Sequence, residues 1–238
     1  AHRLGDRDTT TPWGLPEPAT LTNGGERRRT IAWNDVPPHL ADAVTAVEDK
    51  TFWANTGIDP LGIASSLVDT ITGDPRGGST ITQQLAGTLY ADRTDISLKR
   101  KLVELWWAIQ LERQLSKNEI LERYLNLMYF GHNTYGVEAA SQFYFKHSVR
   151  DISVAESAML VIQLASPALY SPINRPERAR KIQKEILDQM VELQHVDDAH
   201  RRRQCIDVLT VRHHAAAQCA VQEIDPVDGP FHGLPVNR

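Results

Sequence analysis

The chain has 238 residues, of which 41% are hydrophobic and 24% are charged, a composition that is typical of a globular protein and excludes a disordered chain. Its 26 lysines and arginines against 30 acidic residues give a net charge of -4, which argues against a general nucleic-acid-binding protein. No apolar run in the sequence approaches the roughly 18 to 20 residues that cross a bilayer.

Two features of the sequence bear on the compartment in which the protein works. The chain begins at Ala1 with neither a Met nor a signal pattern, so we expect a targeting or anchoring piece to lie outside it. The two cysteines, Cys205 and Cys219, are too few for a disulfide framework and lack the spacing of a zinc site. One disulfide and two thiols are both compatible with the sequence.

The distribution of apolar residues divides the chain into three parts. Residues 1–36 are rich in proline, glycine, threonine and arginine without sustained periodicity, which predicts an irregular approach segment. Their one strand candidate runs from Thr30 to Trp33. Residues 37–194 repeat apolar residues at helical spacing and predict one mainly α domain. Residues 195–238 predict a short helical appendage and a loose tail.

Local signals within residues 37–194 predict where several helices begin. Apolar stripes from Leu40 to Val47 and from Leu61 to Ile71 predict the first two helices. Pro176 predicts the start of a last helix that runs to about Gln194. Reciprocal capping boxes predict three further starts, at Thr80 with Gln83, Ser116 with Glu119, and Ser153 with Glu156.

Two adjacent acids, Glu48 and Asp49, lie near the end of the first predicted helix, where the helix dipole disfavours negative charge. This position raises the pKa of a carboxylate, and more so where neighbours such as Phe52 and Trp53 remove it from water. A raised pKa suits a general base that works near neutral pH. A solvated helix end is the alternative, and it stays open at this point.

A cluster of cations lies at the start of another predicted helix, where the helix dipole disfavours positive charge. Lys99, Arg100 and Lys101 occupy the first turn after Ser97, where unpaired amides already make the potential positive. Phosphate oxygens prefer such a position. Glu104 follows Arg100 by four residues and projects from the same face. Either a plain surface ion pair or a carboxylate beside a phosphate-binding cluster explains this arrangement.

A glycine-led turn precedes the helix that begins at Thr80. It lacks the glycine spacing and the terminal Lys-Ser/Thr of a Walker loop. It does concentrate neutral hydrogen-bonding side chains that can hold a sugar or a phosphate, namely Ser79, Thr80, Gln83 and Gln84.

These segments form an ordered series of motifs: Glu48–Phe52, Gly78–Leu85, Arg100–Glu104, Lys117–Asn126, and Tyr135–Ala140 with Tyr144–Phe145. The series resembles the peptidoglycan glycosyltransferase family, which comprises the transglycosylase domain of class A penicillin-binding proteins and the monofunctional glycosyltransferases. The resemblance runs from about Ala43 to Met190. Each motif alone is weak evidence, and their common order is what carries the resemblance.

The resemblance implies a mainly α, lysozyme-like fold with a large helical lobe, a smaller hydrophobic lobe that dips into the membrane surface, and a cleft between them. It makes the stripe from Leu61 to Ile71 a candidate for the smaller lobe. It also implies polymerisation of lipid II, the lipid-linked disaccharide-peptide, with inversion and release of polyprenyl pyrophosphate. The implied partners are lipid II, the growing glycan chain, the membrane surface and other cell-wall or division proteins, without nucleic acid. The implied location is the extracytoplasmic face of the bacterial cytoplasmic membrane.

The family's functional residues carry over position by position. Glu48 would be the general base, and Glu104 would assist departure of the leaving group or order the cations. Arg100, Lys101 and Lys117 would neutralise the leaving pyrophosphate. The residues assigned to substrate binding are Asp49, Phe52, Gly78, Ser79, Thr80, Gln83, Gln84, Arg100, Lys101, Lys117, Glu122 and Asn126. We assign no metal ligands and no required cofactor, while a Mg or Mn ion would be compatible with departure of the pyrophosphate.

Three positions depart from the family pattern. Asn55 replaces the usual His of the first motif, Gly87 replaces the usual Lys after the second, and Lys146-His147 replaces the usual Gly-Lys after the fifth. These departures keep a second hypothesis open, a catalytically weak protein that binds the precursor or acts as a scaffold of cell-wall synthesis. A third, a lysozyme-like hydrolase, shares the fold class but gives the cation cluster no use.

Overall fold

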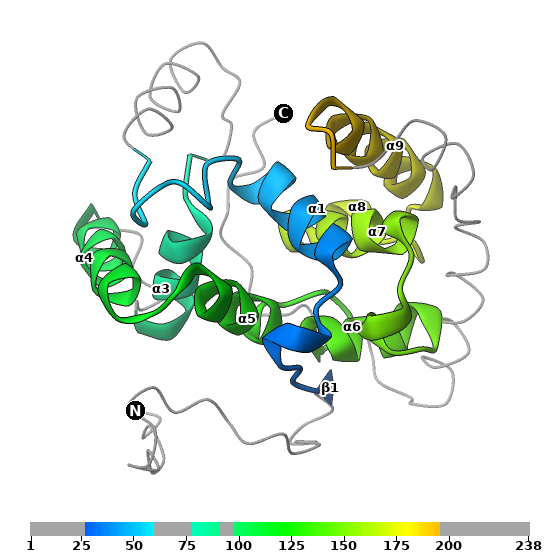
Figure 1. Cartoon of the computed structure of the whole chain (residues 1–238). Helices are drawn as coiled ribbons and strands as arrows, with labels where there is room; N and C mark the ends of the chain where they lie inside the picture. Colours follow the sequence, from blue (N-terminus) through cyan, green and yellow to red (C-terminus); the bar gives the residue numbers. More distant parts are fainter. Residues whose placement is uncertain (1–26, 60–77, 91–97, 196–238) are drawn as a thin grey trace.

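The computed structural model describes residues 27–59, 78–90 and 98–195, and this part of the chain is mostly helical (Figure 1). Two short strands, β1 (Arg27–Arg28) and β2 (Thr134–Tyr135), pair in parallel. The helices are α1 (Pro38–Glu48), α3 (Ile81–Tyr90), α4 (Leu98–Gln114), α5 (Lys117–Leu127), α6 (Val137–Phe145), α7 (Val154–Ala165), α8 (Pro167–Tyr170) and α9 (Pro176–Glu192), with single 3-10 turns at Trp33–Asp35 and Val149–Asp151. The prediction of a mainly α fold is confirmed. None of the described helices is long and apolar enough to span a membrane.

The helices form two groups that meet near the end of α1. In one group α3 packs against α4 and α5, and in the other α7 packs against α1 and α9. Figure 1 shows the first group on the left and the second on the right, with α5 and α6 along the lower edge. Contacts of α6 with α5 and α7 join the two groups.

Helix α7 lies at the centre of the second group because it is apolar on nearly every side. Met159, Leu160, Val161 and Ile162 are consecutive, and all four are buried. Burial of such a side chain stabilises a fold by about 1.5 to 3 kcal/mol. A helix that is hydrophobic all round must be covered on several faces, and α1, α6, α8 and α9 all contact it.

The predicted helix starts are confirmed where the structure describes them. Reciprocal capping boxes close at Ser116 with Glu119 and at Ser153 with Glu156. At the start of α3 the Thr80 amide donates to Gln83 Oε1 at 3.2 Å, and the Gln83 amide donates to Thr80 Oγ1 at 3.1 Å. Pro176 begins α9 as predicted, and the helix ends at Glu192, two residues before Gln194.

The strand predicted from Thr30 to Trp33 is wrong. The Ile31 backbone does not pair with another strand, because the Asn126 side chain takes both its amide and its carbonyl at 2.9 Å each. The Trp33 amide donates to Glu122 Oε2 at 2.7 Å and begins a 3-10 turn. Side chains of α5 therefore hold this segment, and the strand lies earlier, at Arg27–Arg28. The helix predicted from Leu61 to Ile71 lies outside the described residues, as do 1–26 and 196–238.

Candidate active site around Glu48 and Glu104

Glu48 is the last residue of α1, and its carboxylate faces α3. Gln84 Nε2 donates to Glu48 Oε2 at 3.0 Å, and the Tyr124 hydroxyl donates to Gln84 Oε1, also at 3.0 Å. Burial raises the pKa of Glu48, and the hydrogen bond from Gln84 opposes that effect in part. The raised pKa expected from the sequence is confirmed, with burial as its main cause.

The neighbouring acid, Asp49, has a different task. Its side chain is buried, and it accepts hydrogen bonds from the Ile81 amide at 3.1 Å, from Thr51 Oγ1 at 3.1 Å and from Asn55 Nδ2 at 3.0 Å to each oxygen. Asp49 thus caps α3 with a carboxylate, where the helix dipole favours negative charge. Because Gln84 lies on the first turn of that helix, Asp49 also fixes the distance between Gln84 and Glu48.

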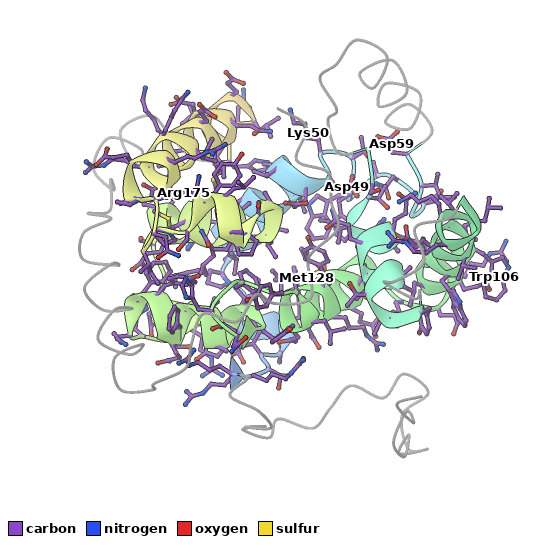
Figure 2. The ribbon with its side chains drawn as sticks, turned by 180° about the vertical axis from the view of Figure 1, so that it is seen from behind. Asp49, Lys50, Asp59, Trp106, Met128 and Arg175 are labelled. Atoms are coloured by element: carbon purple, nitrogen blue, oxygen red, sulfur yellow. The ribbon has the colours of Figure 1, made fainter. Side chains whose placement is uncertain are left out.

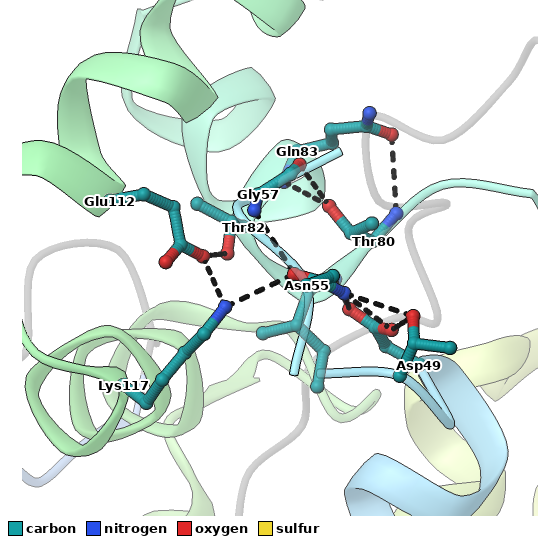
Figure 3. A network of polar contacts seen from close by, with 10 residues as sticks. Asp49, Asn55, Gly57, Thr80, Thr82, Gln83, Glu112 and Lys117 are labelled. Atoms are coloured by element: carbon teal, nitrogen blue, oxygen red, sulfur yellow. Dashed lines mark hydrogen bonds and ion pairs between the residues drawn. The ribbon is translucent and has the colours of Figure 1, made fainter. Parts of the chain in front are cut away.

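A second polar network, shown in Figure 3, links this cap to α4 and α5. Asn55 Oδ1 accepts from Lys117 Nζ at 3.1 Å and from the Gly57 amide at 3.0 Å. Lys117 Nζ lies 2.6 Å from Glu112 Oε1, which also accepts from Thr82 Oγ1 at 2.6 Å. The Lys117 ammonium also lies 4.7 Å from the centre of the buried Phe52 ring, a cation–π contact. The network therefore consists of alternating charges with a neutral amide between them.

The first turns of α4 carry a third cluster. Arg100 Nε and Lys101 Nζ lie 3.0 and 2.9 Å from the two oxygens of Glu104, and Lys101 Nζ donates to Ser79 Oγ at 2.9 Å. Glu104 is buried, whereas both cations are partly exposed. The contact between Arg100 and Glu104 is present, but Glu104 is buried, so it is not the plain surface ion pair that was one of the two alternatives. Two cations on one carboxylate leave the cluster with a net positive charge beside the turn that precedes α3.

The structure brings most of the predicted site residues together, but it separates Lys117 from the other cations. Lys117 is bound to Glu112, and Arg100 and Lys101 are bound to Glu104. These two acids are eight residues apart on α4, which corresponds to about 12 Å along the helix axis. Contact of Lys117 with a substrate therefore stays a prediction.

Several residues assigned to substrate binding have structural contacts of their own. Phe52 and Thr80 are buried, and Thr80 Oγ1 donates to the Gly57 carbonyl at 2.7 Å. Glu122 and Asn126 hold the 31–33 segment, as described above. Gln83 is buried, and among the described residues its Nε2 has no hydrogen-bond partner, an omission that costs about 1 to 3 kcal/mol. Substrate contacts by these residues and by Gly78 stay predictions.

Two residues that organise the site were missed at the sequence level. Tyr124 lies within the motif Lys117–Asn126 but was given no role, and no spacing rule pairs Glu112 with Lys117, since five residues and a helix break separate them. In the described residues no group of three or more His, Cys, Asp or Glu side chains is placed to hold a metal ion.

Comparison with known proteins identifies the family. A family model described as Transglycosylase matches residues 17–191. The chain belongs to the transglycosylase family. It is 41% identical over 167 residues to penicillin-binding protein 1F of Bacillus subtilis (strain 168), covering 69% of this chain and 23% of that protein. It is 41% identical over 173 residues to penicillin-binding protein 1A of Aquifex aeolicus (strain VF5), covering 72% and 24%. It is 42% identical over 171 residues to penicillin-binding protein 1A of Neisseria gonorrhoeae, covering 71% and 21%. The chain thus spans about a quarter of the length of these relatives, and the resemblance read from the motifs is confirmed.

The structure gives each departure from the transglycosylase pattern a local setting. Asn55 is the centre of the network in Figure 3. A Cβ atom on Gly87 would lie 3.1 Å from Glu104 Oε1, so Glu104 packs directly over that glycine. Lys146 ends α6 in the left-handed conformation, with a φ of 70°, which explains why a glycine suits this position.

His147 follows Lys146 and joins α6 to α7. Its Nε2 lies 3.0 Å from Glu156 Oε1, and its Nδ1 lies 3.1 Å from the Ser148 carbonyl oxygen. Burial lowers the pKa of His147, but the Ser148 carbonyl and the Glu156 carboxylate outweigh burial and leave the pKa raised. The one side-chain hydrogen bond of Glu48 among the described residues comes from Gln84 and involves none of these three positions.

Proposed function

We propose that this transglycosylase-family chain is a peptidoglycan glycosyltransferase, which joins lipid II into glycan strands and releases polyprenyl pyrophosphate. The observation that carries the proposal is the state of Glu48. Gln84 Nε2 donates to Oε2 of the Glu48 carboxylate at 3.0 Å, and this is the one side-chain hydrogen bond of Glu48 among the described residues, so Oε1 is not engaged there. An oriented carboxylate with a raised pKa and one available oxygen is suited to general-base catalysis.

The proposed reaction is an inverting displacement at the anomeric carbon of the growing chain. The 4-hydroxyl of the acceptor sugar attacks that carbon, and its proton passes to Glu48 Oε1. A new carbon–oxygen bond forms as the bond to the pyrophosphate breaks, and the bonding electron pair leaves with the pyrophosphate. Attack from the side opposite the leaving group inverts the anomeric centre.

The Glu104 cluster supports departure of the pyrophosphate. Charge develops on the leaving oxygens in the transition state, and preorganised cations stabilise such charge without reorganisation. Arg100 and Lys101 are held by the buried Glu104, so they do not have to be ordered when the substrate binds. We propose Glu104 as the residue that positions these cations. A bound Mg or Mn ion would add to the same neutralisation.

The outer face of α4 supports contact with a membrane surface. Leu102 and Trp106 are four residues apart, and their side chains are 60% and 55% exposed. Figure 2 shows Trp106 at the outer edge of α4, directed away from the body of the protein. Exposed tryptophan beside cations is typical of surfaces that meet lipid headgroups. We propose that the chain works at the extracytoplasmic face of the bacterial cytoplasmic membrane, with other cell-wall or division proteins as partners.

The proposal is tested by incubating the purified protein with labelled lipid II in detergent and resolving the products by size. We expect long glycan from the native protein and a loss of at least about 100-fold in Glu48→Gln, the lower range for removal of a general base. Glu185→Gln is the matched control, because its side chain lies on α9 and is 57% exposed. Equal activity in the native protein and Glu48→Gln would refute the role of Glu48.

The same experiment separates the rival functions. A precursor-binding or scaffold protein would retain lipid II in the native form and in Glu48→Gln but would release no pyrophosphate in either. A hydrolase would instead shorten preformed glycan. The positive Glu104 cluster favours the transferase, because hydrolysis of glycan produces no pyrophosphate for it to neutralise.

A further inference from the structure

Tyr124 belongs to the core, yet its hydroxyl reaches the residue that contacts Glu48. The side chain lies on α5 and is 1% exposed. Its hydroxyl donates to Gln84 Oε1 at 3.0 Å, and this is its one hydrogen bond among the described residues. The phenolic proton therefore has a single acceptor, the carbonyl oxygen of the Gln84 amide.

That hydrogen bond decides which end of the Gln84 amide faces Glu48. An amide presents an acceptor at its oxygen and two donors at its nitrogen. With Oε1 held by Tyr124, Nε2 points to Glu48 Oε2 at 3.0 Å. A reversed amide would place an oxygen against the carboxylate and leave the buried phenolic proton without an acceptor. Each of these changes is unfavourable.

The hydroxyl keeps its proton throughout the physiological range. Burial, and then the negative charges of Glu48 and Asp49, raise the pKa of Tyr124 well above its ordinary value. Tyr124 is therefore a permanent donor. Burial raises the pKa of Glu48, and the hydrogen bond from Gln84 lowers it. The acid next to Glu48 in the sequence is Asp49.

We infer that Tyr124 is a positioning residue for the general base, acting through Gln84 to hold Glu48 ionised and to keep Oε1 directed toward the acceptor sugar. The inference rests on the proposed function of Glu48. It extends that function to a core residue that touches no substrate. It also explains why two glutamines follow each other on α3, since Gln83 serves the cap and Gln84 serves the base.

The test is Tyr124→Phe, which removes the hydroxyl and retains the ring. Gln84 can then reverse, and the ionised form of Glu48 loses a fixed donor. We expect kcat/KM to fall about three- to tenfold on the acid limb of the pH profile, because the donor that stabilises the ionised base is no longer fixed. The loss should shrink to less than about twofold on the plateau of the profile, where the base is ionised in both proteins. Tyr144→Phe is the matched control, because Tyr144 is also buried and donates to the Phe130 carbonyl at 2.8 Å, away from Glu48.

Two further measurements separate positioning from simple destabilisation. Gln84→Met should move the acid limb of the pH profile as Tyr124→Phe does, and Tyr124→Phe added to Gln84→Met should move it no further. Carbon-13 NMR of the Glu48 carboxyl group should show a midpoint at higher pH in Tyr124→Phe, and this readout does not depend on turnover. An unmoved NMR midpoint, or an additive loss in the double variant, would overturn the inference. If the native protein does not polymerise lipid II, that result would count against the proposed function, whereas the NMR midpoint would still test the role of Tyr124.

Discussion

Gly57 contacts three parts of the site: its amide donates to Asn55, its carbonyl accepts from Thr80, and its Cα faces Glu112. These contacts allow the loss of stability caused by one added methyl group to be worked out. Its φ is +85°, and a Cβ atom would lie 2.6 Å from Glu112 Cγ and 3.1 Å from the Ala108 carbonyl oxygen. The left-handed backbone costs a non-glycine residue about 1 to 2 kcal/mol, and overpacking adds about 1 to 3 kcal/mol. We therefore expect Gly57→Ala to lower the free energy of unfolding by about 3 kcal/mol.

The matched control is Gly87→Ala. Gly87 has a helical backbone within α3, and its Cβ atom would meet the end of the Glu104 side chain at 3.1 Å. Alanine favours a helix over glycine by about 1 kcal/mol, which offsets a small shift of Glu104, so we expect a change within about 1 kcal/mol. Urea denaturation measures the free energy of unfolding of both variants. In thermal denaturation, the melting temperature should fall by about 2 to 4 °C for each kcal/mol lost. Equal losses in the two variants, or a loss below about 1 kcal/mol in Gly57→Ala, would refute this account.

Three further outcomes are expected from stability measurements. Because its raised pKa means that the folded state disfavours ionised Glu48, Glu48→Gln should be more stable than the native protein at pH 8, and the gap should close as pH falls below about 4; a constant gap would contradict burial as the cause. Lys146→Gly should raise the free energy of unfolding by up to about 1 kcal/mol, since it relieves a φ of 70°; a loss in urea denaturation would contradict the strain. The raised pKa of His147 predicts that pairing with Glu156 adds stability below about pH 6.5 and that this contribution is lost as pH rises through the raised pKa. His147→Gln should accordingly cost up to about 1 kcal/mol at pH 5.5 and less at pH 9, and an equal cost at both would contradict an ionic contact.

The sequence was sufficient for features whose cause is local. A capping box needs two side chains three residues apart, so Ser116 and Ser153 marked the starts of α5 and α7. The strand prediction at Thr30–Trp33 failed for the opposite reason. Its backbone partner is the side chain of Asn126, 95 residues away, and no periodicity in the segment contains that information.

The same distinction applies to the candidate site. Glu48 could be singled out because it lies at a helix C-terminus, where the dipole disfavours negative charge. Glu104 could be singled out because it lies one turn after cations at a helix N-terminus, where the dipole disfavours positive charge. The hydrogen bond that orients Gln84 toward Glu48 could not be predicted, since Tyr124 and Gln84 are 40 residues apart in the sequence. Lys117 was grouped with Arg100 and Lys101 through the family resemblance, whereas Glu112 and Asn55 determine where its ammonium lies.

Asn55 shows how a departure from a family pattern can preserve a site. The position lies between an anion and a cation, with Nδ2 donating to Asp49 and Oδ1 accepting from Lys117. A neutral imidazole offers one donor and one acceptor and could bridge them in one tautomer, but a protonated imidazole has no acceptor for an ammonium. An amide offers both at every pH. Asn55 therefore maintains the link between Lys117 and the α3 cap without a titrating group.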